Sequence, residues 1–242
     1  SSGIILNIII AKFYSPAILG IFNQSLAFYF LISFLGSWGI NYSVLESISK
    51  VENNKKEIES IIVSSIISTL LCGLIITFIY SNLIDQITIF FNSQNLKKGL
   101  FSIIPAVFFG SLNKVFLFGI LNGLRRMREF AIFQSLRYLI ILIGLVIFIY
   151  LPLEGGYLPI IVSFSEIILF LIMFYRIVSE INFLYSKNFL RWIYRHLIFG
   201  TKAVFTGFLS EANTKVDVLM IGFLLNDKDV GIYSFASLFI EG

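Results

Sequence analysis

The stretch Ile10–Asn23, which reads IAKFYSPAILGIFN, ends one apolar segment of the chain and begins the next. A second stretch, Ile221–Ser234, reads IGFLLNDKDVGIYS and does the same. The Gly20-Ile21-Phe22 of the first aligns with the Gly231-Ile232-Tyr233 of the second, an offset of 211 positions (231 minus 20). In an apolar chain such a repeat predicts two similar membrane-embedded lobes, which is a common architecture of transporters that alternate access around a central site.

The composition supports a membrane location. Hydrophobic residues make up 57% of the chain and charged residues 13%, and the mean hydropathy is +0.91, whereas a soluble domain carries about 25% charged residues. Most of the surface must therefore face lipid. The apolar runs are about 20 residues long and do not alternate with a period of two, so we expect an all-α, multi-pass transmembrane helical bundle.

The apolar runs predict six complete spans and two partial ones. We expect a first six-helix lobe over residues 1–185 and the start of a second lobe over residues 200–242, so that the chain is a fragment of a longer transporter. Six spans separate the two copies of the repeat, so both copies should enter the membrane from the same side. The predicted spans are 3–13 (partial), 19–44, 58–80, 100–121, 130–150, 157–177, 198–225 and a partial one from 230.

The segment 186–199 differs from the spans because its basic and apolar residues each recur every four positions, on roughly opposite faces of a helix. We expect a short amphipathic helix that lies on the cytoplasmic surface and links the two lobes. The residues that form the two faces are Lys187, Arg191 and Arg195, and Phe189, Ile193 and Leu197.

The Lys and Arg residues of the loops predict the orientation. Ten lie on the side of the loops after the second, fourth and sixth spans, and four lie on the other side, which places the richer side in the cytoplasm. The first group is Lys50, Lys55, Lys56, Arg125, Arg126, Arg128, Arg176, Lys187, Arg191 and Arg195, and the second is Lys12, Lys97, Lys98 and Lys228.

The sequence contains few of the residues and motifs that are typical of catalytic sites. His196 is the only histidine and Cys72 the only cysteine, which argues against a His-based acid–base pair and against a His or Cys metal cluster. The phosphate-binding loop Gly-x-x-x-x-Gly-Lys-Ser/Thr is absent. We expect no cofactor, no metal, no nucleic-acid partner and no enzymatic activity, which leaves transport as the leading class.

Charged residues inside the spans are the candidate site. Lys114 lies in the fourth span, Glu166 in the sixth, and Glu211, Lys215 and Asp217 in the seventh. Each costs about 2.5–3.5 kcal/mol or more at the membrane centre, so each should face a cavity or a partner. One interpretation is an aqueous cavity that they all border. The alternative is that Glu211 and Lys215 form a structural i,i+4 pair and that Lys114 extends to the cytoplasmic edge.

A cavity lined by Lys and Arg would attract a phosphate or sugar-acid headgroup. We assign substrate binding to Lys114, Lys215, Asn213 and Arg125. For Arg125, at the predicted cytoplasmic mouth, contact with anionic lipid and setting of topology are the simpler alternative. Buried acids could bind H⁺ or Na⁺ and couple a gradient to transport, and we assign this role to Glu211, Asp217 and Glu166.

Three places in the chain resemble the polysaccharide-biosynthesis transporters, the O-antigen flippase type within the multidrug/oligosaccharidyl-lipid/polysaccharide (MOP) exporter superfamily. They are FYSPAILGIF at 13–22 with GSWGIN at 36–41, LNGLRRMREFAI at 121–132, and DVLMIG at 217–222 with VGIY at 230–233. The start of the seventh span departs from the family, because Phe199-Gly200-Thr201-Lys202 lacks the proline that often follows the glycine.

The resemblance implies a MATE-like fold of about 12 to 14 helices in two lobes around a cationic cavity. It also implies that an oligosaccharide linked to undecaprenyl pyrophosphate crosses the inner (cytoplasmic) cell membrane, with membrane lipids around the protein and an ion gradient as the energy source. The expected process is surface polysaccharide synthesis, such as O-antigen, lipopolysaccharide or capsule. A multidrug or cation antiporter of the same superfamily and a membrane-embedded polysaccharide polymerase are the alternatives.

Overall fold

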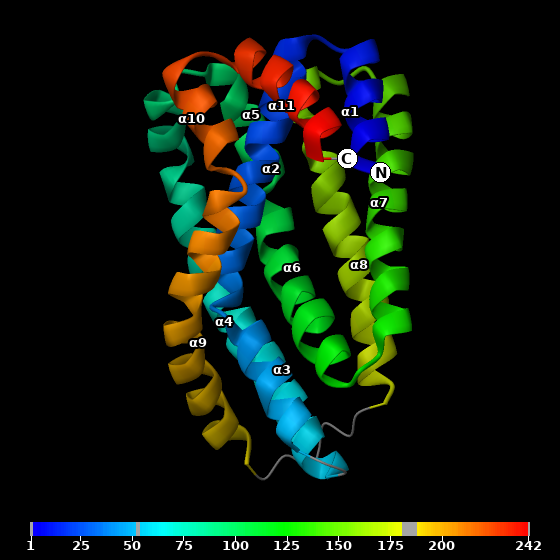
Figure 1. Ribbon diagram of the computed structural model, residues 1–242, viewed down its shortest axis with the longest axis vertical. Helices are drawn as coiled ribbons and strands as arrows, with labels where there is room; N and C mark the ends of the chain where they lie inside the picture. Colours follow the sequence, from blue (N-terminus) through cyan, green and yellow to red (C-terminus); the bar gives the residue numbers. More distant parts are fainter. Residues whose placement is uncertain (1, 52–53, 181–187, 242) are drawn as a thin grey trace.

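The computed structural model describes residues 2–51, 54–180 and 188–241, and these form an elongated bundle of helices without a strand (Figure 1). The predicted all-α fold is confirmed. The helices are α1 (Ser2–Phe13), α2 (Pro16–Ser37), α3 (Ile40–Lys50), α4 (Lys55–Phe90), α5 (Gln94–Ser102), α6 (Ile104–Lys114), the π-helical η1 (Val115–Leu121), α7 (Met127–Tyr150), the short 3₁₀ turn η2 (Gly155–Tyr157), α8 (Ile160–Val178), α9 (Phe189–Asn213), α10 (Val216–Leu224) and α11 (Asp227–Glu241).

Five stretches of the described chain are long and apolar enough to cross a membrane. They overlap the predicted second to sixth spans, so the multi-pass architecture is confirmed for that part of the chain. Two bounds differ, because α2 ends at Ser37 where the predicted span continues to 44, and α4 continues to Phe90 where the predicted span ends at 80. The predicted seventh span is not among them, because it is divided between α9 and α10 and carries several charges. The five stretches are Pro16–Ser37, Lys55–Phe90, Ile104–Leu121, Met127–Tyr150 and Gly155–Val178.

Helix α2 is the central element of the bundle, with neighbours α4, α6, α9 and α11. Its start follows the predicted signal, since the Ser15 hydroxyl accepts a hydrogen bond from the Ile18 N–H and Pro16 occupies the first turn. Its end is set by Trp38 and Gly39, which both have positive φ (50° and 64°). The chain then continues in nearly the same direction as α3 (Figure 1).

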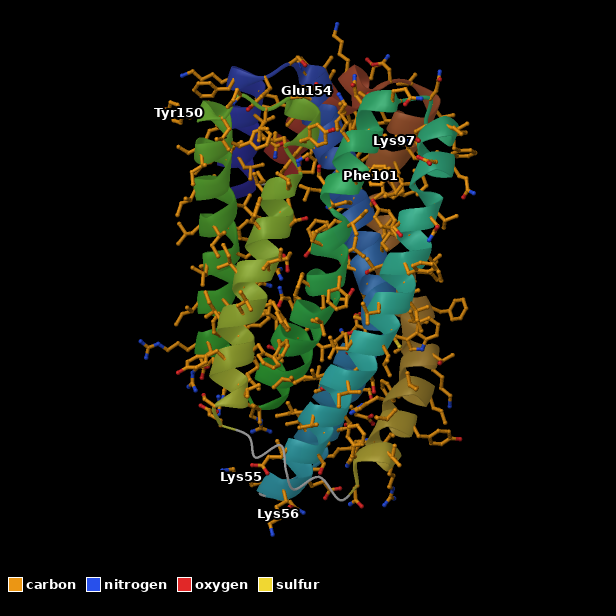
Figure 2. The ribbon with its side chains drawn as sticks, turned by 180° about the vertical axis from the view of Figure 1, so that it is seen from behind. Lys55, Lys56, Lys97, Phe101, Tyr150 and Glu154 are labelled. Atoms are coloured by element: carbon orange, nitrogen blue, oxygen red, sulfur yellow. The ribbon has the colours of Figure 1, made fainter. Side chains whose placement is uncertain are left out.

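Loops that the sequence places on opposite sides of the membrane lie at opposite ends of the bundle. Lys55 and Lys56 lie at one end, while Lys97 and Glu154 lie at the other (Figure 2). We call these the basic end and the opposite end. Each has its own apolar core: Ile40, Ile61 and Phe116 belong to the core near the basic end, and Tyr80 and Leu100 to the core near the opposite end.

Both copies of the repeat lie at the opposite end, where α2 and α11 begin (Figure 1). They touch directly, because a Cβ atom built on Gly20 would lie 3.0 Å from the Gly231 nitrogen. Both copies therefore lie at one end of the bundle, as the prediction that they enter the membrane from the same side requires.

The region around the predicted linker differs from expectation. Residues 181–187 lie outside the described part, and Phe189 to Asn213 form one continuous helix, so the predicted boundary between 199 and 200 falls inside α9. Trp192 and His196 are buried (5% and 0% exposed) rather than at a lipid headgroup surface. The buried stripe of α9 consists of Trp192, His196, Gly200, Val204 and Gly207. The predicted basic residues Arg191 and Arg195 are exposed, and the predicted apolar residues Phe189, Ile193 and Leu197 are half-buried beside the stripe.

Candidate functional site

The strongest candidate site is an ion pair between two distant parts of the chain. Lys114, the last residue of α6, places its Nζ 3.0 Å from Oε1 of Glu211 on α9. The same Nζ donates to the Phe30 carbonyl oxygen at 3.2 Å and lies 5.0 Å from the centroid of the Phe34 ring. The Lys114 side chain is 9% exposed and that of Glu211 30% exposed. Burial and these contacts make Lys114 a fixed cation rather than one that extends to the membrane edge.

A cavity of about 230 Å³ adjoins this pair. Asn41 and Asn122 each have a buried side-chain oxygen without a hydrogen-bond partner among the described residues. Such oxygens are costly unless a ligand or water satisfies them. The cavity is lined by Phe34, Asn41, Tyr42, Leu45, Lys114, Phe118, Asn122 and Glu211.

This arrangement can exchange one anion for another. An ammonium group has three N–H donors, and Lys114 uses two of them, toward one backbone carbonyl and one carboxylate. An incoming phosphate oxygen could therefore take the position of the Glu211 carboxylate. Glu211 would then lose its cationic partner, and its carboxylate would be left beside the cavity.

Lys215 lies nearby but does not pair with Glu211 as one interpretation of the sequence suggested. The i,i+4 geometry needs a continuous helix, and the helix is interrupted between Asn213 and Val216. Lys215 instead places its Nζ 5.3 Å from the centroid of the Phe30 ring. Both lysines thus contact Phe30: Lys114 binds its carbonyl oxygen, and Lys215 lies over its ring.

Asp217 borders a different cavity, of about 350 Å³, together with Tyr233 and otherwise apolar residues of α10 and its vicinity. The Tyr233 hydroxyl donates to the Asp217 carboxylate, and the Val218 N–H donates to it at 2.8 Å. Asp217 is therefore not among the residues that line the Lys114 cavity.

Glu166 is fully buried inside the bundle, where Arg137 neutralises it. The Arg137 Nε lies 2.9 Å from Glu166 Oε1, and the Asn113 Nδ2 donates to Glu166 Oε2 at 2.7 Å. This polar network joins α6, α7 and α8. The sequence interpretation did not use Arg137, although the rule that singled out Glu166, a charge inside an apolar span, applies equally to it.

The other two predicted site residues lie apart from the cavity. Arg125 is exposed in the turn before α7, where its φ is 57°, and Asn213 is exposed at the end of α9. The structure therefore brings together Lys114, Glu211 and, at Phe30, Lys215.

The basic end contains a larger cavity, of about 650 Å³. Its charges are balanced, since Lys55 and Arg126 face Glu59 and Glu180, and Arg126 Nη2 lies 2.5 Å from Glu180 Oε2. The hydrogen bond from Arg126 lowers the pKa of Glu180 below its ordinary value of 4.5. Among the described residues, no group of three His, Cys, Asp or Glu side chains could hold a metal ion.

Comparison with known proteins adds one finding. The model of a family described as "Polysaccharide biosynthesis protein" matches residues 2–239. No curated protein sequence and no solved structure matches the chain.

Proposed function

The chain belongs to the polysaccharide biosynthesis protein family, and we propose that it is part of a transporter that moves a lipid-linked oligosaccharide across the cytoplasmic membrane. The family membership supports a role in polysaccharide synthesis or export, and the five apolar helices support a multi-pass membrane location. The Lys114 site supports binding of an anionic headgroup, because it offers a cation and hydrogen-bonding groups beside a cavity.

The ion pair between Lys114 and Glu211 carries this proposal. Lys114 belongs to the predicted first lobe and Glu211 to the first helix of the predicted second lobe, so the pair joins the two parts that must move relative to each other. The phosphate groups of the lipid carrier would compete with Glu211 for Lys114. The freed Glu211 carboxylate would then be the group that binds the coupling ion, H⁺ or Na⁺, and so links substrate binding to an ion gradient.

The test uses the complete protein in a strain that lacks it. We expect Lys114→Gln to abolish or strongly reduce surface polysaccharide, and Lys114→Arg to retain part of it. Lys202→Gln is the matched control, because Lys202 is an exposed lysine of α9. Normal surface polysaccharide in Lys114→Gln cells, at a normal amount of protein in the membrane, would contradict the proposal.

One observation favours a second function, an antiporter for organic cations. Asp217 is a carboxylate beside apolar side chains such as Met220 and Leu224, a combination that suits a hydrophobic cation. The same strain distinguishes the two functions. Restored surface polysaccharide supports the oligosaccharide transporter, and resistance to cationic drugs without restored polysaccharide supports the antiporter.

A further inference from the structure

The two copies of the repeat pack against each other in an equivalent way. A Cβ atom built on Gly20 would lie 1.8 Å from the Asp227 carbonyl oxygen, and one built on Gly231 would lie 1.9 Å from the Pro16 carbonyl oxygen. Asp227 follows Pro16 by 211 positions (227 minus 16), which is also the offset between the two glycines. Each copy thus presents its glycine to the same carbonyl of the other, as a local two-fold axis requires.

This contact accepts only glycine at both positions. Distances below 3.0 Å to backbone atoms cannot be relieved by a side-chain rotation, so any larger residue must push α2 and α11 apart. Close helix contacts through small residues are a common form of helix association in membranes, and they allow Cα–H···O contacts between the backbones. The repeat is therefore explained by packing at a helix–helix contact.

Hydrogen bonds between polar side chains stabilise the glycine contact between α2 and α11. The Asp227 carboxylate accepts hydrogen bonds from Gln24 Nε2 on α2, at 2.9 Å, and from the Ser93 hydroxyl between α4 and α5, at 2.6 Å. Gln24 is fully buried and lies against Gly222, where a Cβ atom would be 2.3 Å from its Oε1. One carboxylate thus connects the start of α11 to two separate elements.

An aromatic pair adds a contact between α10 and α4. The rings of Phe223 and Phe90 stack with centroids 4.3 Å apart and an interplanar angle of 13°. Together with the glycine contact and Asp227, this pair closes the opposite end of the bundle between α10–α11 and the helices before residue 185.

The helix that leads to this contact is interrupted at a defined place. The helix is interrupted at Thr214 and Lys215, between α9 and α10. On the far side of the interruption, α9 is held to α3 and α4 by buried contacts, among them His196 Nδ1 at 2.8 Å from the Ser43 hydroxyl. Glu211, the partner of Lys114, lies one turn before the interruption.

From these observations we propose that Gly20, Gly231, Asp227, Gln24 and Ser93 form the outer gate of the transporter, which is closed in this structure. The inference rests on the proposed function and on the distribution of Lys and Arg, which places the opposite end outside the cell. The gate opens when α10 and α11 turn about residues 214–215 and separate Gly20 from Gly231. Glu211 lies one turn before these residues, so the charge pair and the gate adjoin the same interruption of the helix.

The test measures access to the gate without measuring transport. In a cysteine-free version of the complete protein, with Cys72 replaced by Ala, Ser234→Cys is the reporter. Ser234 is 5% exposed and lies one turn from Gly231 on the same buried face of α11. A membrane-impermeant maleimide is added outside intact cells. We expect Gly20→Leu to raise the labelling rate at least tenfold, because the leucine holds the two helices apart.

Gly3→Leu is the matched control, since a Cβ atom at Gly3 meets no atom within 4 Å, and it should leave the rate unchanged. Asp227→Asn is a milder second variant that keeps the glycine contact and should raise the rate severalfold. Unchanged labelling in Asp227→Asn, and in Gly20→Leu if that variant reaches the membrane, would overturn the gate. The labelling rate does not depend on the substrate. The experiment can therefore contradict the gate without contradicting the transport proposal, and the transport assay can contradict transport without contradicting the gate.

Discussion

Lys114 shows how far single residues could be predicted from the sequence. A lysine inside an apolar span indicates a cavity or a partner, and the structure supplies both. The sequence could not identify Glu211 as that partner, because the pairing depends on how α6 and α9 pack and on an interruption after Asn213 that no proline marks. Arg137 was detectable by the same rule but was not used.

The buried pair of Glu166 and Arg137 leads to a prediction about stability. Removal of one partner leaves an uncompensated buried charge, so Arg137→Leu should lower the free energy of unfolding by about 3–5 kcal/mol. Thermal unfolding of the purified protein in detergent measures the effect. Arg137→Leu combined with Glu166→Leu should recover much of the loss. A double variant no more stable than Arg137→Leu would contradict a direct pair.

A pH-dependent contribution is expected at the basic end. The pKa of Glu180 is lowered by Arg126, so the stability that this pair adds is complete above the ordinary pKa of 4.5 and is lost as the pH falls through the lower folded-state value. Because the pair is exposed, Glu180→Gln should cost about 0.2–1 kcal/mol near pH 7. The difference in thermal stability should shrink below pH 4.5, and a difference that grows on acidification would contradict this assignment.

At the scale of elements, the sequence predicted the long apolar helices and missed the subdivided ones. Hydropathy predicts α4, α7 and α8 because a segment that spans lipid must be a helix, which satisfies its own backbone hydrogen bonds, and must carry a long run of apolar side chains. It does not locate the change to π-helix at Val115, where the chain packs against α3, because the residues of η1 are as apolar as those of an α-helical span. The periodicity of α9 predicted its exposed basic residues, Arg191 and Arg195. It did not predict the buried stripe, because a histidine and two glycines lie in that stripe between the apolar side chains.

Two aromatic residues of α9 lie on different faces of the helix, one buried and one exposed, so their removal should affect stability differently. Trp192 is 5% exposed and Tyr194 69% exposed. Truncation of a large buried side chain costs about 3–5 kcal/mol, so Trp192→Ala should markedly lower the midpoint of thermal unfolding, and Tyr194→Ala should change it little. Equal, small effects of both variants would instead agree with a helix that lies on the membrane surface.

At the scale of the whole molecule, the repeat predicted that the two glycine junctions share one end, and their contact confirms it. The sequence could not show that the two copies touch. An internal repeat indicates that two lobes have similar structures, but it does not give the distance between them. The predicted common cavity remains untested for the second lobe. Within the described chain, the predicted charges divide among the Lys114 cavity, the Asp217 cavity and the Glu166 network.

The orientation of the bundle can be tested with single cysteines at its two ends. Lys97→Cys and Lys55→Cys lie at opposite ends (Figure 2) in a background with Cys72 replaced. The positive-inside rule predicts that a membrane-impermeant maleimide reaches position 97 in intact cells and reaches position 55 only after the cells are opened. The reverse pattern would invert the assignment of the outer gate.

The most direct measurement is movement of the substrate itself. The complete protein is reconstituted in vesicles that contain an oligosaccharide on an undecaprenyl pyrophosphate carrier, and the fraction of oligosaccharide that reaches the opposite leaflet is followed with time. The account predicts rapid movement with the unaltered protein and with Lys202→Gln, and little above protein-free vesicles with Lys114→Gln. Equal movement with Lys114→Gln and with the unaltered protein would contradict it.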